Sequence, residues 1–231
     1  MPDVTQLPPD ESVVVGRVEA LREVIREVRG DAHAVRIVAV TKTFDESSYA
    51  LAARAGCDAL GENYAQELLD KLGRLGEPPA LPVHFIGHLQ SNKVKSLAPH
   101  IALWHTVDRA SVVAAIAKES ARLGVAARIL VQVNSTDESQ KSGCAPTDVS
   151  GLVAAARNAG LVVEGLMTMG PSNADPDATR RAFRATAHLA VDLGVAELSM
   201  GMTHDVRIAL EEGSTIVRVG SGIFGERPRS A

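Results

Sequence analysis

The sequence predicts an α/β fold, a single (β/α)8 TIM barrel with one extra helix in front of the first strand. Two observations predict it. Eight short β-rich runs alternate with segments of helical periodicity, and no linker, low-complexity run or composition shift divides the chain. Strands that alternate with helices pair in parallel through right-handed crossovers. Eight such units favour a closed barrel, and a doubly wound open sheet is the second interpretation.

Each element follows from its local pattern. Residues 11–29 form the extra helix, because Val14, Val18 and Leu21 recur at helical spacing between charged residues. The strands are short apolar runs, and glycines such as Gly124 end the helices between them. The expected strands are 35–41, 58–60, 83–86, 101–107, 127–133, 161–167, 197–200 and 215–219. The expected helices after them are 45–56, 63–75, 91–97, 109–123, 147–159, one that ends near 193, and 203–212, with at most a short one after the last strand.

Composition bounds the class of protein. The 231 residues carry 24 Lys and Arg against 28 Asp and Glu, a formal charge of −4, and are 45% hydrophobic, as in ordinary globular proteins. The slightly acidic balance argues against duplex nucleic acid, and four Phe, two Tyr and one Trp argue against stacking on single strands. The polar start of the chain contains no signal-like or membrane-spanning run. We expect a flexible tail at 1–10, one domain at 11–231, a cytoplasmic location and no membrane partner.

No metal site or disulfide is expected. Cys57 and Cys144 lie 87 residues apart and match no metal or redox spacing. His84 and His88 are four apart, but on a strand that spacing separates them by about 13 Å.

The chemistry of a barrel lies at the carboxyl ends of its strands. Lys42 is the most informative residue there, because it closes an apolar strand and lysine is rarely buried without a partner. One interpretation is a lysine that reaches out to the rim. The other is an amine in a partly desolvated barrel mouth, whose lowered pKa makes it nucleophilic toward a carbonyl. The product would be a Schiff base with a substrate ketone or with an aldehyde cofactor.

The loops after strands seven and eight often bind phosphate in such barrels. Gly201 opens the approach to a helix that Thr203 can cap, with Asp205 in its first turn. Gly220 allows backbone N–H groups to approach an anion, and Ser221 adds a hydroxyl. The alternative is that the glycines only permit tight turns.

A phosphate held there, opposite Lys42, would span the barrel mouth. A flat aldehyde with a phosphate arm fits this arrangement, and pyridoxal 5′-phosphate (PLP) is such a molecule. Arg218 would then hydrogen-bond the pyridine nitrogen, although spacing alone equally allows a surface or ion-paired arginine.

Several stretches also resemble the motifs of one family, in the same order over residues 36–227. They are 38–42 (VAVTK), 61–64 (GENY), 84–87 (HFIG), 89–93 (LQSNK), 133–143, 165–167 (GLM), 199–202 (SMGM), 213–220 (GSTIVRVG) and 223–225 (IFG). This pattern is similar to that of the YggS/PROSC family, the pyridoxal phosphate homeostasis proteins.

The resemblance implies a barrel like the N-terminal domain of alanine racemase, with PLP in Schiff-base linkage to Lys42. It implies Asn63 near the ring and Arg218 facing the ring nitrogen. It also implies a group of residues around the phosphate, namely Ser199, Gly201, Met202, Gly220 and Ser221. The chain departs from the family pattern at Ser221, where Thr is commoner, and at Thr203, where Ser is commoner. His88 occupies a variable position and receives no role.

We expect a carrier in intracellular PLP (vitamin B6) homeostasis and supply rather than an enzyme. A charged Arg218 at the pyridine nitrogen weakens the electron sink. In alanine racemase the opposing tyrosine comes from a second, β-rich domain, whereas this chain ends six residues beyond Gly225 and contains only Tyr49 and Tyr64. The alternatives are a PLP-dependent racemase or lyase, whose weak activity stays open, a Schiff-base aldolase for sugar phosphates, and a plain phosphate-binding barrel. We expect a monomer, with PLP-dependent apo-enzymes as candidate recipients.

Overall fold

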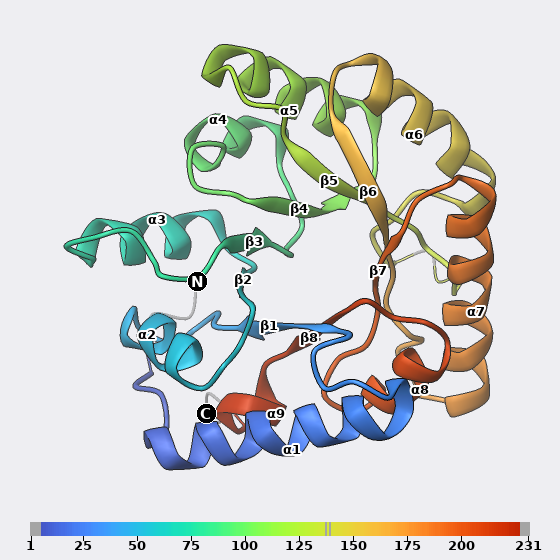
Figure 1. Ribbon diagram of the computed structural model, residues 1–231. Helices are drawn as coiled ribbons and strands as arrows, with labels where there is room; N and C mark the ends of the chain where they lie inside the picture. The colour runs from blue at the N-terminus through green and yellow to red at the C-terminus, as the bar shows by residue number, and fades with distance from the viewer. Residues whose placement is uncertain (1–5, 137, 139, 227–231) are drawn as a thin grey trace.

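The computed structural model describes residues 6–136, 138 and 140–226. In this part of the chain eight parallel strands close a barrel, with each strand beside the next and β8 paired with β1 (Figure 1). The strands are β1 (Arg36–Val40), β2 (Ala59–Glu62), β3 (Val83–Phe85), β4 (Leu103–Val107), β5 (Arg128–Gln132), β6 (Val162–Met167), β7 (Glu197–Ser199) and β8 (Ile216–Val219). The predicted barrel is therefore confirmed, and the open sheet is excluded.

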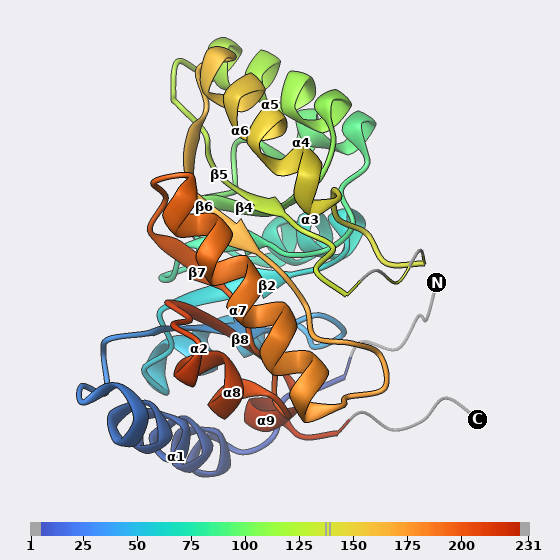
Figure 2. The same ribbon diagram turned by 90° about the vertical axis from the view of Figure 1, so that its right-hand side faces the viewer.

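Helices surround the barrel on its outside (Figures 1 and 2). The extra helix α1 packs against α2, α8 and α9, and α7 runs beside α8. The α-helices are α1 (Glu11–Arg29), α2 (Ser47–Arg54), α3 (Ala65–Arg74), α4 (Val94–Leu97), α5 (Ala110–Leu123), α6 (Val149–Asn158), α7 (Pro176–Asp192), α8 (Val206–Glu211) and α9 (Ser221–Phe224), with 3₁₀ turns η1 (Ser91–Lys93) and η2 (Pro146–Asp148). Most of these elements begin or end a few residues inside the ranges expected from the sequence.

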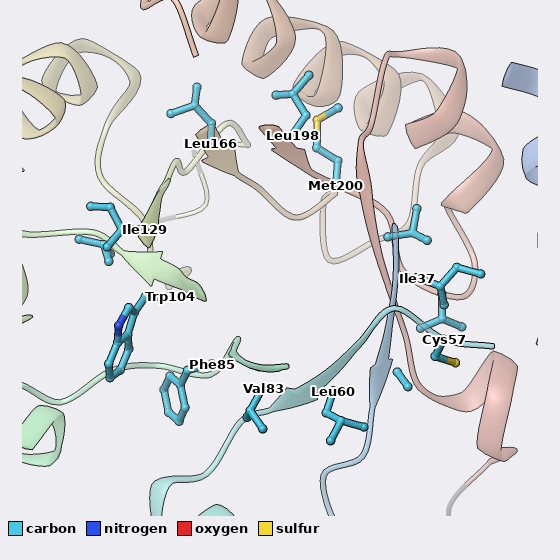
Figure 3. Close-up of a cluster of buried hydrophobic side chains, with 14 of the residues drawn as sticks. Ile37, Cys57, Leu60, Val83, Phe85, Trp104, Ile129, Leu166, Leu198 and Met200 are labelled. Atoms are coloured by element: carbon cyan, nitrogen blue, oxygen red, sulfur yellow. The ribbon is translucent and has the colours of Figure 1, made fainter. Parts of the chain in front are cut away.

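The larger core fills the space between the barrel and its helices. Alternate strand residues such as Ile37, Leu60 and Trp104 belong to it, together with Ile116 and Phe183 from the helices. Figure 3 shows several of these strand side chains spread around the outside of the barrel. Full burial of one such side chain contributes about 1.5–3 kcal/mol, so this shell supplies most of the apolar stabilisation.

A smaller apolar cluster lies inside the barrel. It consists of one residue from each of six strands: Val38, Ala59, Leu103, Leu130, Met167 and Ile216. Because strand side chains alternate between faces, the residue two positions further along also points inward, one layer nearer the carboxyl end. In β4 and β8 those residues are His105 and Arg218, both buried. The interior therefore changes from apolar to polar toward the end where a barrel carries its chemistry.

The start of the chain is described only in part. Positions 1–5 of the expected tail lie outside the described residues. The backbone N–H of Gln6 donates to the carbonyl of Thr43 (2.9 Å), and its carbonyl accepts from the N–H of Asp45 (3.1 Å). Among the residues with assigned positions, no helix is both long enough and apolar enough to cross a bilayer.

Candidate cofactor site

Lys42 lies in a tight turn directly after β1. The N–H of Phe44 donates to the carbonyl of Thr41 (3.1 Å), which closes a four-residue turn with Lys42 at its second position. Thr43, at the third position, has a φ of +72°. A positive φ at this position is typical of a type II turn and favours glycine, so a β-branched residue there is strained. The side chain of Lys42 is half-buried.

Arg218 lies on β8, the neighbour of β1, and is 3% exposed. Its guanidinium donates to the carbonyl of Ser199 (2.7 Å), to Oγ of Ser199 (2.6 Å) and to the carbonyl of Thr168 (3.0 Å). These acceptors are neutral, and within the described residues no carboxylate forms an ion pair with Arg218. Burial lowers the pKa of Arg218 to about 10, so the group stays cationic at neutral pH. Such a buried cation suits a ligand that brings an acceptor or negative charge.

A hydrogen-bonded chain continues from Arg218 into the barrel. Oγ of Ser199 lies 2.9 Å from Nδ1 of His105, and Nε2 of His105 lies 3.0 Å from Nδ1 of His84. Burial lowers the pKa of His84 to about 3 and lowers the pKa of His105 as well, so both rings are neutral. Because Arg218 donates to Oγ, the hydroxyl hydrogen of Ser199 is available to His105. This series of hydrogen bonds therefore holds Ser199 and Arg218 in place from inside the barrel.

The loops after β7 and β8 are joined by their hydroxyl groups. Oγ1 of Thr203 lies 3.1 Å from Oγ of Ser221 and accepts the N–H of Gly222 (3.0 Å). Gly201 precedes this contact with a φ of +94°, and a Cβ there would lie 2.7 Å from Cβ of Ala209. Only glycine fits this position without displacing α8. Four of the residues expected to surround a phosphate, Gly201, Met202, Gly220 and Ser221, thus lie where the two adjoining loops meet at one rim, whereas Ser199 is buried at the end of β7.

The expected cap of the helix after β7 is wrong. The helix begins at Val206 rather than at residue 203, and Asp205, expected in its first turn, precedes it. Thr203 does not cap it, because its hydroxyl binds the neighbouring loop instead. The carboxylate of Asp205 accepts the N–H of Met202 (2.5 Å), which folds the chain back before α8 begins.

Asn63 follows β2, and its Oδ1 is buried without a hydrogen-bond partner among the described residues. Its backbone packs closely against Gly87 in the loop after β3. A Cβ on Gly87 would lie only 1.9 Å from the Asn63 carbonyl oxygen. A buried amide oxygen without a partner is costly. Asn63 therefore offers an unused acceptor beside the mouth.

A separate pocket of about 380 Å³ lies against the loops after β6 and β7. Lys141, Gly170, Met202 and His204 are among its lining residues, whereas Lys42 and Arg218 are not. The ammonium of Lys141 donates to the carbonyl of Gly170 (2.6 Å) and pairs with Glu138. The described part of the polar loop 134–143 is therefore tied to the loop after β6, and positions 137 and 139 lie outside the described residues.

Two sets of buried residues near Lys42 and Arg218 were not predicted from the sequence. One is the buried pair His84 and His105. The other is a buried cluster of Glu62, Glu67 and Lys71 beneath the Lys42 turn, where Lys71 is 0% exposed. The signal for the second was the four-residue spacing of Glu67 and Lys71 on one helix face, next to a glutamate at the end of a buried strand.

Comparison with known proteins places the chain in a family. Residues 17–228 match the family described as alanine racemase, N-terminal domain. The pyridoxal phosphate homeostasis protein of Pseudomonas aeruginosa is 36% identical over 214 residues, 91% of this chain and 93% of that protein.

Solved structures agree in fold. PipY of Synechococcus elongatus, solved with PLP bound, is 28% identical with a TM-score of 0.81 over 92% of this chain and 100% of that chain. A histidine racemase from Leuconostoc mesenteroides is 21% identical with a TM-score of 0.72, and the match covers 94% of this chain but 58% of that one. The chain belongs to the family of pyridoxal phosphate homeostasis proteins, built on the barrel of the alanine racemase N-terminal domain.

Proposed function

We propose that this protein binds PLP as a Schiff base on Lys42 and serves as a carrier in PLP homeostasis. The observation that carries the proposal is the convergence on one barrel end of Lys42, the buried cation Arg218 and the joined loops at Ser221. The names of the curated relatives and the PLP bound to PipY support it.

The residues present fit this cofactor. An aldehyde requires an amine, which Lys42 supplies, and the condensation releases water. The buried guanidinium of Arg218 suits a pyridine nitrogen, because its partners are neutral oxygens and its charge is unpaired within the described residues. The orphaned Oδ1 of Asn63 provides a further polar contact near the ring. Each main part of the cofactor therefore has a chemically matched group.

The phosphate would lie at the joined loops. We assign its contacts to backbone and hydroxyl groups of the loops after β7 and β8, at Gly201, Met202, Gly220 and Ser221. Ser199, buried at the end of β7, supports Arg218 from the interior instead. The first N–H groups of a helix such as α9 have no helical acceptors, which favours an anion there, although that of Gly222 already donates to Thr203 and, in the loop after β7, that of Met202 donates to Asp205.

The chain's two tyrosines favour a carrier over a racemase. Bound PLP supplies an electron sink for carbanions, but racemisation also needs an acid on the face opposite the lysine. Tyr49 is 3% exposed and donates to Glu62 (3.0 Å), and burial raises the pKa of its hydroxyl. Tyr64 is 46% exposed at the start of α3. Neither hydroxyl is therefore suited to act as the second acid. A cationic Arg218 at the pyridine nitrogen would also make bound PLP a weaker electron sink.

The first test compares wild type with Lys42→Ala. Wild type incubated with PLP should show a visible absorbance that borohydride removes and fixes covalently, whereas Lys42→Ala should show neither after gel filtration. A wild type without a reducible chromophore, or a variant that retains the same one, would contradict the assignment of Lys42. Binding of inorganic phosphate without any reducible adduct would favour the plain phosphate-binding barrel.

A second test separates carrier from catalyst. Amino acids incubated with the PLP-loaded protein in deuterated water should exchange their α-proton no faster than with free PLP. Faster exchange that Lys42→Ala abolishes would establish the racemase or lyase alternative. Loss of PLP from the protein to an added PLP-dependent apo-enzyme, with activation of that enzyme, is the result expected of a carrier. We expect the monomer to be the active form, which sedimentation of the loaded protein tests.

A further inference from the structure

A buried ionic cluster lies directly beneath the turn that carries Lys42. The ammonium of Lys71 on α3 is 0% exposed and, among the described residues, has three oxygen partners: the carbonyl of Thr41 (2.8 Å), Oε1 of Glu62 (2.7 Å) and Oε1 of Glu67 (2.8 Å). An ammonium has three N–H donors, so each has an acceptor. Lys71 is thereby fully committed to holding its neighbours.

Two members of the cluster contact the backbone on either side of Lys42. Lys71 donates to the carbonyl of Thr41, the residue before it. Glu67 accepts the N–H of Thr43, the residue after it. The two side chains are one helical turn apart and form an ion pair with each other, so the same face of α3 contacts both flanking residues.

The turn held in this way is strained. Thr43 has a φ of +72°, and its Oγ1 is buried without a partner among the described residues. A β-branched residue does not favour a positive φ, so contacts with the surrounding structure must impose this conformation on Thr43. The charge-assisted hydrogen bond from its N–H to Glu67 is the contact that does so from α3.

Glu62 completes the cluster from β2. Its Oε1 accepts from Oγ1 of Thr41 (2.8 Å) and the hydroxyl of Tyr49 (3.0 Å) as well as from Lys71. Thr41 is therefore held through both its side chain and its carbonyl. The base of the turn and the helix form one hydrogen-bonded unit.

We propose that Glu67 and Lys71 are positioning residues for Lys42, which fix the backbone on both sides of it so that its amine is presented to PLP in one orientation. The inference rests on the proposed role of Lys42. It assigns no contact with the cofactor to either residue. Their effect on PLP passes through the conformation of residues 41–43.

The matched variants are Glu67→Gln and Glu67→Met. Glutamine keeps an oxygen that accepts the Thr43 N–H, whereas methionine has a similar length and offers no such acceptor. Asp70→Met is the control, because Asp70 is exposed on the same helix and, within the part of the chain that the structure describes, its carboxylate hydrogen-bonds Gln66 alone. Thermal unfolding of each variant verifies that it is folded at the assay temperature.

The first readout needs no cofactor. Amide hydrogen exchange across residues 41–44 in the PLP-free protein should accelerate about tenfold in Glu67→Met, since a hydrogen bond to a charged acceptor is lost. Glu67→Gln and Asp70→Met should stay within about twofold of wild type. Equal exchange in wild type and Glu67→Met would overturn the proposal regardless of what Lys42 binds.

The second readout is the bound cofactor. Glu67→Met should bind PLP about tenfold more weakly and lose most of the induced circular dichroism of the visible band, while Glu67→Gln keeps both, since only methionine removes the hydrogen bond. A fall in melting temperature with unchanged affinity and dichroism would show a purely structural role and refute positioning. If wild type itself forms no reducible adduct, the proposed function fails, and the exchange readout still decides whether the cluster holds the turn.

Discussion

Lys71→Met removes the one cation of the buried cluster and should destabilise the protein strongly. The side chains of Lys71 and Glu62 are both 0% exposed, and that of Glu67 is 24% exposed. Methionine retains most of the apolar stem but leaves the Glu62 carboxylate buried without a counter-charge. The effect should therefore come from electrostatics and hydrogen bonding rather than from a cavity.

The magnitude follows from the burial of the pair. Removing one partner of a buried ion pair costs about 3–5 kcal/mol. For a chain of this size each kcal/mol lowers the melting temperature by about 2–4 °C, so Lys71→Met should melt about 6–20 °C lower. The double variant Lys71→Met/Glu62→Gln removes the stranded charge and should recover to within about 2 kcal/mol of wild type.

The loss should also depend on pH. Burial raises the pKa of Glu62, and in wild type the Lys71 ammonium opposes that shift. A carboxyl whose pKa is higher in the folded state binds its proton preferentially there, so stability falls as pH rises from the unfolded pKa through the folded one. Lys71→Met should therefore be closer to wild type at about pH 5 than at about pH 8.

Chemical denaturation at both pH values measures these differences, with the double variant as control because it lacks the Glu62 carboxyl. A single variant within about 1 kcal/mol of wild type at both values would refute the picture of a dry, mutually dependent cluster. A loss of stability in Lys71→Met that becomes larger as pH falls would refute it as well.

Three further outcomes follow from individual side chains. Thr43→Gly should raise stability by about 1 kcal/mol in urea denaturation, because it relieves a positive φ and removes a buried hydroxyl that has no partner in the described structure, and a lower midpoint would contradict the strain. Arg218→Lys should cost about 2–3 kcal/mol in the same assay, because one ammonium cannot reproduce the forked bonds to Ser199 and Thr168, and an unchanged midpoint would contradict their importance. Burial raises the pKa of the Cys57 thiol to about 12, so a thiol reagent at neutral pH should label it only after unfolding, and rapid labelling of the native protein would disprove its burial.

Much of the fold was predictable because its signals are local. Alternating apolar runs and helical stripes identified the strands and helices, and their number and order implied closure. The rule that chemistry lies at the carboxyl ends of barrel strands directed attention to Lys42 and Arg218, and in the structure Lys42 follows β1 while Arg218 lies on the neighbouring strand β8. These inferences required no knowledge of side-chain contacts.

The contacts themselves depend on register and on loop geometry. Arg218 meets Ser199 and Thr168 only because the barrel closes with β6, β7 and β8 side by side. Thr203 could satisfy either its own helix or the neighbouring loop, and local pattern favoured the helix, which was wrong. Lys71 belongs to an amphipathic helix, where a charged residue ordinarily indicates the solvent face.

The proposed function depends first on Lys42 being the amine that holds PLP. The most direct measurement is peptide mass mapping of the protein after incubation with PLP and reduction with borohydride. We expect one dominant adduct, on the peptide that contains Lys42, with the lysine resistant to trypsin. An adduct predominantly on another lysine, or no adduct above that of an unrelated protein treated in the same way, would contradict it.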